Sequence, residues 1–459
     1  MKKAMILLLA TLLTVTLSGS ASPATEIEEY KEYKSGDFTY TLDQSGNAEI
    51  TGYRGDERDL TVPYEADGHP VTSIGDGAFW RCKGLSSVTL PEGLQSIGND
   101  CFSECSGVTS IVLPKGLQTI GNGAFFSCIG LSSVTLPEGF QSIGDGAFFE
   151  CPNLTSVTLP DSLISMGSNP FIGFHDLSFI HLSPNHPVFA VTDGVLFNKK
   201  DKILIAYPMT SKPGAYRAPS GTRMIGDFAL WGCTGLTLAV LPEGLESIGE
   251  FAFSGCSGLE SIELPQDLES IGTGAFNSCS SLESIVLPDG LKSIGDFVFW
   301  QCFELASVTL PYSLISMGAN PFLEFHDLAS VRVSPDHPVF SVTGGVLFNQ
   351  KDKILIAYPM TAKTGAYQVP SGTRAIGMNA FWYCARLTSV VLPEGLESIG
   401  DYAFYSCSSL KSAELPEGLK SIGVSAFEEC SHLVLTVPQD SYAQQYAQDN
   451  GIPYEVISK

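Results

Sequence analysis

The pattern of apolar and polar residues along this chain repeats every 23 residues. In residues 154–160, Leu-Thr-Ser-Val-Thr-Leu-Pro, apolar residues alternate with Ser and Thr. Such alternation predicts a short, half-buried strand, which proline ends because it cannot donate a ladder hydrogen bond. A second short extended piece ends in Ile-Gly, and the following Ala-Phe-x-x-Cys predicts a single helical or 3₁₀ turn. One such coil cannot bury its apolar side alone, so the pattern predicts a stack of coils.

The Ile-Gly pair marks the register of the repeat. It recurs thirteen times, with Met in place of Ile in two units, which predicts about 13 coils. The first residues of the pairs are Ile74, Ile97, Ile120, Ile143, Met166, Ile225, Ile248, Ile271, Ile294, Met317, Ile376, Ile399 and Ile422.

The repeat is interrupted twice, after Met166 and after Met317. Each interruption adds 36 residues to one repeat, and the two are 151 residues apart, so a long block has been duplicated. The added residues, about 183–218 and 334–369, contain two apolar runs around a polar turn. This pattern predicts a β-hairpin in each insert.

The two ends of the chain differ from the repeat. We expect residues 25–70 to form an N-terminal β cap, residues 71–438 the solenoid and residues 439–459 a helical C-terminal cap. In the last segment, Ser441 is the expected N-cap of a short helix that stops at Asn450-Gly451. Caps of this kind keep a solenoid from associating end to end.

The repeat unit Leu-x-Ser-Val-x-Leu-Pro-x-Gly-Leu-x-Ser-Ile-Gly-x-x-Ala-Phe-x-x-Cys resembles the BspA-like class of bacterial surface leucine-rich repeats. The resemblance covers roughly residues 36–456. It implies a mainly β leucine-rich-repeat solenoid with short helical turns. It also implies surface display, adhesion to host matrix or plasma proteins, and contact with other microbes. The family carries no catalytic motif.

The first 24 residues are typical of a secretory signal peptide. Lys2 and Lys3 precede an apolar run over residues 4–17, and small residues come next, with expected cleavage after Ala21 or Ala24. No later run is long enough for a transmembrane helix, and no wall-sorting motif is seen. The expected location is therefore extracellular, secreted or associated with the cell surface, and the protein is not expected to be embedded in a membrane.

The net charge of the chain limits the classes of partner that it is expected to bind. The formal net charge is −24, which argues against nucleic acid and anionic membranes, since Lys and Arg clusters supply affinity for both. The acidic surface either keeps the protein soluble or serves to bind a cationic partner or divalent ions. The expected partner is an extracellular protein, from host matrix or a microbial surface, or a glycan.

The cysteines follow the repeat rather than a disulfide framework. Eleven of the twelve occupy one repeat position, and the twelfth, Cys101, replaces an alanine. A cysteine at the same point of each coil predicts an inward ladder of small, reduced thiols, since side-by-side Cβ vectors rarely meet disulfide geometry. No CxxC pair exists, and no metal site is expected.

Aromatic residues occupy two neighbouring repeat positions. The phenylalanine of Ala-Phe predicts a core ladder. The next position carries large rings, which either pack between adjacent turns or form a stripe for protein or glycan contact, since Trp and Tyr dominate interface hot spots. These rings are Trp80, Phe126, Phe149, Trp231, Trp300, Trp382 and Tyr405.

Most outward positions of the strands are Ser, Thr, Val or Glu. Phe179, His181 and Arg332, beside the inserts, break this pattern and mark either a contact patch or drift of the repeat. No phosphate-binding loop, nucleophile elbow or zinc-binding helix is present, so neither catalysis nor a cofactor is expected. The sequence predicts a binding or adhesion scaffold for a protein partner; the alternatives are a glycan-binding protein and a structural surface-layer component.

Overall fold

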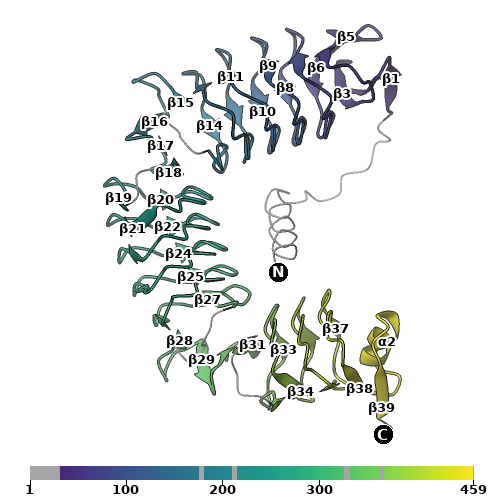
Figure 1. The fold of residues 1–459 in the computed structure, drawn as a ribbon, viewed down its shortest axis with the longest axis vertical. Helices are drawn as coiled ribbons and strands as arrows, with labels where there is room; N and C mark the ends of the chain where they lie inside the picture. Colours follow the sequence, from purple (N-terminus) through teal and green to yellow (C-terminus); the bar gives the residue numbers. More distant parts are fainter. Residues whose placement is uncertain (1–30, 175–179, 209–213, 325–330, 361–364, 458–459) are drawn as a thin grey trace. The chain divides into compact units, whose positions relative to one another are not determined.

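The computed structural model describes residues 31–457 apart from 175–179, 209–213, 325–330 and 361–364. The chain divides into two compact units, Met1–Thr210 and Ser211–Lys459. The expected leader, residues 1–24, lies outside the described residues. Each unit is a stack of β coils, shown by colour along the sequence in Figure 1.

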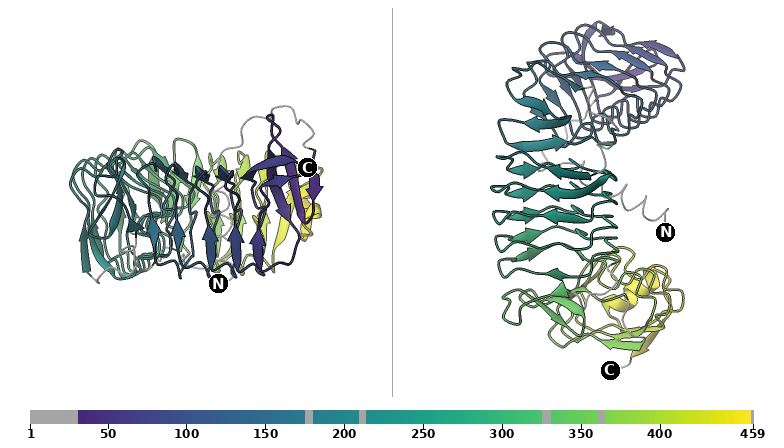
Figure 2. Two further views of the ribbon diagram at one scale, coloured as in Figure 1. Left: turned by 90° about the horizontal axis from the view of Figure 1, so that it is seen from above. Right: turned by 60° about the vertical axis from the view of Figure 1, so that its left-hand side comes forward.

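Every Ile-Gly pair ends a short strand, as the repeat predicts. The strands pair in parallel and in constant register within each unit; Thr119, for example, lies opposite Ser96 on one side and Ser142 on the other. Figure 2 shows such strands lying one beside the next in unit 2. They are β6 (His69–Ile74), β8 (Ser96–Ile97), β10 (Thr119–Ile120), β12 (Ser142–Ile143), β14 (Ser165–Met166), β20 (Met224–Ile225), β22 (Ser247–Ile248), β24 (Ser270–Ile271), β25 (Ser293–Ile294), β27 (Ser316–Met317), β33 (Ala375–Ile376), β35 (Ser398–Ile399) and β37 (Ser421–Ile422).

The strand predicted before each proline forms a second set of parallel ladders. In it, a buried Val or Ile alternates with exposed Thr or Glu, because successive residues of a strand face opposite sides. Its strands are β4 (Asp59–Thr61), β7 (Ser87–Thr89), β9 (Ser110–Val112), β11 (Val134–Thr135), β13 (Val157–Thr158), β15 (Ile180–His181), β19 (Gly214–Arg217), β21 (Leu236–Val240), β23 (Ser261–Glu263), β26 (Val308–Thr309), β28 (Val331–Arg332), β32 (Gly365–Gln368), β34 (Leu387–Val391), β36 (Ser412–Glu414), β38 (Val434–Pro438) and β39 (Tyr454–Ile457).

The residues after each Ile-Gly pair, which we call the turn segment, form tight turns closed by three-residue hydrogen bonds, the pattern of the 3₁₀ alternative rather than of the helical one. Alternate N–H groups bond back by three residues, as from Trp80 N to Gly77 O at 2.9 Å. The N–H groups between them cross to the next coil, as from Phe79 N to Cys101 O at 2.9 Å. We call this row of crossing bonds the turn ladder. It holds neighbouring coils together where a helix would have bonded only to itself.

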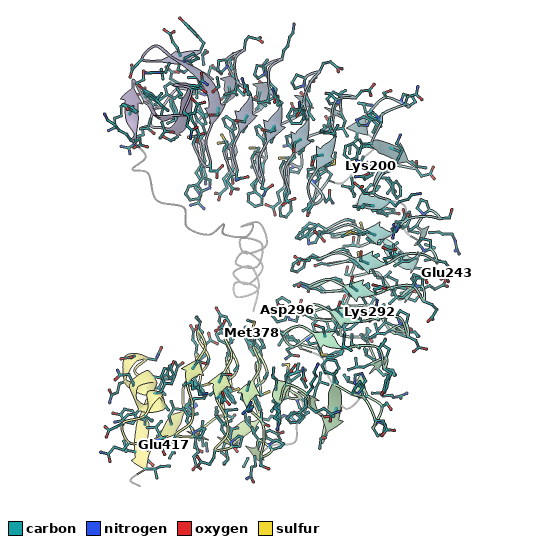
Figure 3. The ribbon with its side chains drawn as sticks, turned by 180° about the vertical axis from the view of Figure 1, so that it is seen from behind. Lys200, Glu243, Lys292, Asp296, Met378 and Glu417 are labelled. Carbon is teal, nitrogen blue, oxygen red and sulfur yellow. The ribbon has the colours of Figure 1, made fainter. Side chains whose placement is uncertain are left out.

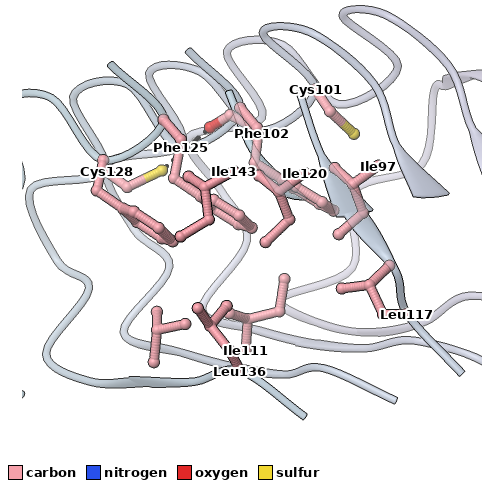
Figure 4. Close-up of a cluster of buried hydrophobic side chains, with 14 of the residues drawn as sticks. Ile97, Cys101, Phe102, Ile111, Leu117, Ile120, Phe125, Cys128, Leu136 and Ile143 are labelled. Carbon is pink, nitrogen blue, oxygen red and sulfur yellow. Dashed lines mark hydrogen bonds between the residues drawn. The ribbon is translucent and has the colours of Figure 1, made fainter. Parts of the chain in front are cut away.

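The core of each stack is built from the predicted ladders. Phe102 and Phe125 lie with their rings 5.4 Å apart and nearly parallel, beside Ile97, Ile120 and Ile143 (Figure 4). Stacking of this kind adds to the stabilisation that burial of each ring supplies.

The cysteines lie beside the phenylalanine ladder, and all twelve are free thiols. Ten are buried, and Cys82 and Cys430, in the first and last of the thirteen coils, are partly exposed. The thiol of Cys128 donates to the carbonyl oxygen of Phe102, at 3.1 Å, and the same bond recurs from coil to coil. Seven of the ten buried thiols bond across the coil boundary in this way, whereas Cys233 and Cys384 bond to a carbonyl oxygen of their own coil.

Each insert contains three antiparallel strands, so the expected hairpin carries one strand more. They are β16 (Phe189–Thr192), β17 (Val195–Asn198) and β18 (Ile203–Ala206) in the first insert, and β29 (Phe340–Thr343), β30 (Val346–Asn349) and β31 (Ile354–Ala357) in the second. In the second insert β31 stacks in parallel on β33, and the ring of Tyr358 lies 4.8 Å from Phe381. The insert therefore adds a coil of its own. With such additions the chain has about 17 turns, more than the 13 that the Ile-Gly pairs predict.

A buried histidine fixes each insert to the coil before it. The Nε2 atom of His186 lies 3.0 Å from the carbonyl oxygen of Pro160, and its Nδ1 atom accepts from the backbone N–H groups of Val188 and Phe189. His337 repeats these contacts in the second insert. His186 and His337, which lie 151 residues apart, are therefore structural.

The chain ends depart from the coil pattern. At the start, β1 (Tyr33–Ser35), β2 (Phe38–Leu42) and β3 (Ala48–Tyr53) pair in antiparallel order, and β5 (Glu65–Ala66) pairs with β6. At the finish, helix α2 (Tyr442–Asp449) lies beside β38 and β39 (Figure 1). The predicted helix is confirmed, with the Ser441 side chain accepting from Gln444 N and Asn450 as the C-cap.

Candidate binding surface on the turn segments

The column of large rings lies on the turn segments, one residue after the phenylalanine ladder. This placement puts each ring beside the core but outside it. Trp80 is exposed, Phe126, Trp231 and Tyr405 are half-buried, and Phe149, Trp300 and Trp382 are buried. The seven rings therefore do not form one continuous exposed stripe.

Neighbouring side chains decide how far two of these rings are exposed. The third residue after the isoleucine is Gly77 in the coil of Trp80, and the Trp80 ring is 52% exposed. In the coil of Trp300 the same position is Phe297, whose ring lies 6.3 Å from the indole, and Trp300 is 4% exposed. An aromatic residue three positions earlier thus covers the indole.

The exposed Trp80 ring is in contact with a positively charged side chain. The Arg81 guanidinium lies 4.3 Å from its centroid, within the range of a cation–π contact. The same guanidinium donates to both carboxylate oxygens of Glu104, at 2.9 Å each. The indole therefore presents a flat apolar face to solvent.

The largest group of rings lies on the coils of Ile376 and Ile399. Trp382 stacks on Tyr405 at 4.5 Å, and Tyr402 meets both rings at about 6 Å. Tyr383 lies 5.4 Å from Trp382. We call Trp382, Tyr383, Tyr402 and Tyr405 the C-terminal aromatic cluster. Its three tyrosines are partly exposed over the buried indole.

Two members of this cluster could not be singled out from the sequence. Tyr383 and Tyr402 have left-handed backbones, with φ of 53° each, and bulky residues are rare there. The same two positions are left-handed in most coils, as at Arg81 and Phe297, so the repeat itself sets this backbone. The residue type at these positions varies from coil to coil, so the sequence gives no separate signal for the two tyrosines.

Acidic residues border the cluster. Burial and the neighbouring Glu429 raise the pKa of Tyr405 to about 12, and Ser406 donates a hydrogen bond to Glu429. Glu428 and Glu429 are both exposed. The site thus combines aromatic faces with negative charge, which suits a cationic side chain.

The remaining sequence candidates lie on the strands. His181 and Arg332 are exposed and occupy equivalent places, since His181 pairs with Thr158 and Arg332 with Thr309. Phe179 lies outside the described residues. His181 lies in unit 1. Arg332 lies in unit 2, on β28, in a different coil from those that carry the C-terminal aromatic cluster.

The charged surface is partly neutralised along the stack. In the described part of the chain, five ion pairs link residues 23 apart in neighbouring coils, such as Lys292 with Glu269 at 2.6 Å, and their side chains are 29–71% exposed. Pairs of this kind add about 0–1 kcal/mol each. They engage five of the 25 Lys and Arg residues, and the chain as a whole keeps its acidic excess.

Side chains on the turn segments add a polar ladder between coils. The Oδ1 atom of Asp296 accepts from Ala319 N at 2.6 Å, and Asp145 accepts from Ser168 N at 2.6 Å. Figure 3 labels Asp296, and it also labels Met378, which takes the same position without an acceptor oxygen. These carboxylates therefore have a structural role wherever a following coil supplies the N–H.

Among the described residues, no three His, Cys, Asp or Glu side chains are grouped so as to hold a metal ion. Within the same residues no helix has the length and hydrophobicity that crossing a bilayer requires.

Comparison with known proteins finds relatives among bacterial surface proteins. Six copies of the BspA type leucine rich repeat region match residues 70–190, 218–342 and 362–447. No curated protein matches the chain.

Several solved structures are similar. A leucine-rich cell surface protein from Faecalibacterium prausnitzii is 25% identical, over 69% of this chain and 97% of that one, with a TM-score of 0.47. A leucine-rich repeat protein from Bacteroides ovatus is 23% identical, over 93% and 99%, with a TM-score of 0.39. The pneumococcal vaccine antigen PcpA is 18% identical, over 94% and 98%, with a TM-score of 0.46. Since the family match spans well over half of the sequence, the chain belongs to the BspA-type leucine-rich-repeat family.

Proposed function

We propose that this protein is an exported scaffold, secreted or displayed at the cell surface, that binds an extracellular protein partner without catalysing a reaction. The C-terminal aromatic cluster is the observation that carries the proposal. Trp and Tyr supply large contact areas at low entropic cost, and they are enriched among the residues that dominate interfaces. The apolar leader over residues 4–17 supports export.

The chemistry of the surface favours a partner with cationic side chains. Three partly exposed tyrosines surround Trp382, and Glu428 and Glu429 lie beside them. A Lys or Arg of the partner would meet aromatic faces and carboxylates together. The net charge of −24 would also speed the approach of a basic protein.

Capture of proteins from host matrix and microbial surface extracts tests the proposal. The immobilised chain is compared with a Tyr402→Asn variant, because Asn tolerates the left-handed backbone at this position. The control is Tyr64→Asn, which removes an exposed tyrosine from unit 1. We expect Tyr402→Asn to weaken capture about tenfold, as loss of a hot-spot ring does, and Tyr64→Asn to leave it unchanged. Capture of no protein by the parent chain contradicts the proposal.

The exposed indole of Trp80 favours glycan binding as a second function. A sugar ring can stack on such an exposed aromatic face, and Arg81 beside it is a hydrogen-bond donor. A glycan array together with tryptophan fluorescence tests this function. Absence of array signal, with fluorescence unchanged on adding sugars, removes it.

A further inference from the structure

The turn ladder joins successive regular coils by the same set of bonds. In the coil of Ile376, the N–H groups of Asn379, Phe381 and Tyr383 donate to carbonyl oxygens of the following coil, at 2.7–3.0 Å. In the next coil, the corresponding N–H groups of Tyr402, Phe404 and Ser406 do the same, at 2.8–2.9 Å. Three alternate donors therefore face forward from these two turn segments, and the next coil supplies three alternate acceptors.

The ladder ends at the coil of Ile422. Its forward donors are the N–H groups of Ser425, Phe427 and Glu429, and none of them has an acceptor within the residues that the structure describes. The chain continues instead into β38 and α2. The last turn segment thus presents an unused row of backbone donors, which is the edge to which an extended chain can add.

A groove lies along this row. It has a volume of about 780 Å³ and is lined on one side by the turn segment and on the other by Tyr446 and residues 450–453. Val424, at its edge, is 67% exposed. Cys430 in its wall is half-buried, although the same cysteine is buried in most other coils. The helical cap therefore covers the sheets of the last coil without filling the space beside its turn.

The groove is acidic at its rim. Glu428 and Glu429 line it and are exposed, and neither forms an ion pair with any residue in the described part of the chain. Glu429 accepts a hydrogen bond from the hydroxyl of Ser406. An occupant that complements this rim carries Lys or Arg.

A second copy of the chain fits the groove poorly. At each regular junction with an Asp or Asn two residues after the isoleucine, the side chain accepts a backbone N–H of the next coil, as Asp401 does from Val424 N at 2.7 Å. In the last coil this position is Val424, which has no acceptor. Val424 alone does not exclude a further coil, because the solenoid continues past Met378, which also lacks an acceptor. The acidic rim and the net charge of −24 disfavour a second copy of the same acidic chain.

We propose that this groove binds an extended, basic segment of a partner protein. Its backbone carbonyls accept from the N–H groups of Ser425, Phe427 and Glu429, and a Lys or Arg side chain lies against Glu428 and Glu429. This inference rests on the proposed function of protein binding, and it names the form and charge of the segment that is bound.

A fluorescent peptide with the sequence of residues 75–83 and the change Cys82→Ser tests the proposal. It reproduces a turn segment of this chain, so its carbonyls alternate in the required way, and it carries Arg81 and Lys83. Fluorescence anisotropy with the full chain measures binding. We expect Glu428→Lys to weaken it roughly tenfold, and the control Glu394→Lys, an exposed glutamate elsewhere in unit 2, to change it less than about twofold.

Hydrogen exchange locates the bound peptide. We expect residues 424–431 to become protected and residues 401–408, whose donors are already bonded, to stay unchanged. Absence of binding, binding without protection of 424–431, or equal weakening by both lysine substitutions overturns the proposal. Self-association of the free chain that the peptide abolishes also overturns it, since the occupant is then a second copy.

The two proposals can fail separately. The peptide assay leaves Tyr402 unchanged, and the capture assay leaves Glu428 unchanged. If extracts yield partners whose capture depends on Tyr402 while the peptide does not bind, the groove proposal alone is wrong. If the parent chain captures nothing, the proposed function fails whatever the peptide does.

Discussion

The coils of Ile120 and Ile422 are built from the same 23-residue unit and differ in their C-terminal neighbours. The turn segment of the Ile120 coil donates to the next coil from Gly123, Phe125 and Ser127, and Phe125 lies between two parallel rings. In the Ile422 coil the corresponding donors have no acceptor among the residues that the structure describes. The difference shows that in a solenoid a position acquires its chemistry from the neighbouring coil as much as from its own residue.

The same contrast applies to the core at the two places. Phe125 is fully buried, with Phe102 and Phe148 at 5.4 and 5.3 Å. Phe427 has a parallel ring only on one side, Phe404 at 5.0 Å, and meets Tyr446 edge-on at 6.4 Å. The groove beside it gives the last coil room to rearrange.

The largest effect we expect comes from removing an interior ring. Phe125→Ala should lower the free energy of unfolding by about 3–5 kcal/mol, because it leaves a cavity between rigid neighbours. Phe427→Ala should cost roughly half as much, since the end coil can collapse around the lost ring. Urea denaturation followed by circular dichroism measures both. Equal losses would show that the last coil is packed as rigidly as the interior.

A smaller effect is expected from the polar ladder. Asp145→Ala should lower the free energy of unfolding by about 1.5–3 kcal/mol, because the half-buried Ser168 N–H loses a charged acceptor. Val424→Asp places the same carboxylate beside the end of the stack, where no further coil is present, and we expect a change within about 0.5 kcal/mol. A large gain in stability from Val424→Asp in the same denaturation assay would mean that the new carboxylate accepts a hydrogen bond there. The last coil would then not differ in this respect from the interior coil of Asp145.

The smallest effect concerns pH. Burial, together with Asp227 and Asp296, raises the pKa of Glu250 above its ordinary value. The charged form is therefore disfavoured in the folded state, so the parent chain loses stability as pH rises through this pKa. Glu250→Gln should raise the free energy of unfolding at pH 7, by less than about 1 kcal/mol for this partly exposed group. The gain should vanish below pH ~4, where the glutamate is protonated in both states. A gain that is equal at both pH values would point to a cause other than charge.

The sequence predicted most of the fold because the repeat fixes its own register. The Ile-Gly pairs placed all thirteen strands of the first set, and the aligned Phe and Cys columns predicted the core ladders. Whether the second insert adds a coil or projects from the solenoid could not be decided from the sequence, because Tyr358 replaces a ladder phenylalanine without any repeat motif around it.

The candidate site could be predicted only in part. The sequence identified the column that contains Trp382 and Tyr405, but exposure in that column depends on side chains in adjacent positions and coils, as Phe297 beside Trp300 shows. The groove could not be foreseen, because it exists where a coil is absent. The only sequence signal was Val424 at a position that other coils often fill with Asp or Asn.

Hydrogen exchange of the free protein tests most directly whether the last coil keeps its donors unused. We predict slow exchange at the N–H groups of Tyr402, Phe404 and Ser406, which the turn ladder protects, and exchange at least about tenfold faster at Ser425, Phe427 and Glu429. Equal protection of the two segments would contradict this claim, because the donors of the last coil would then already be bonded.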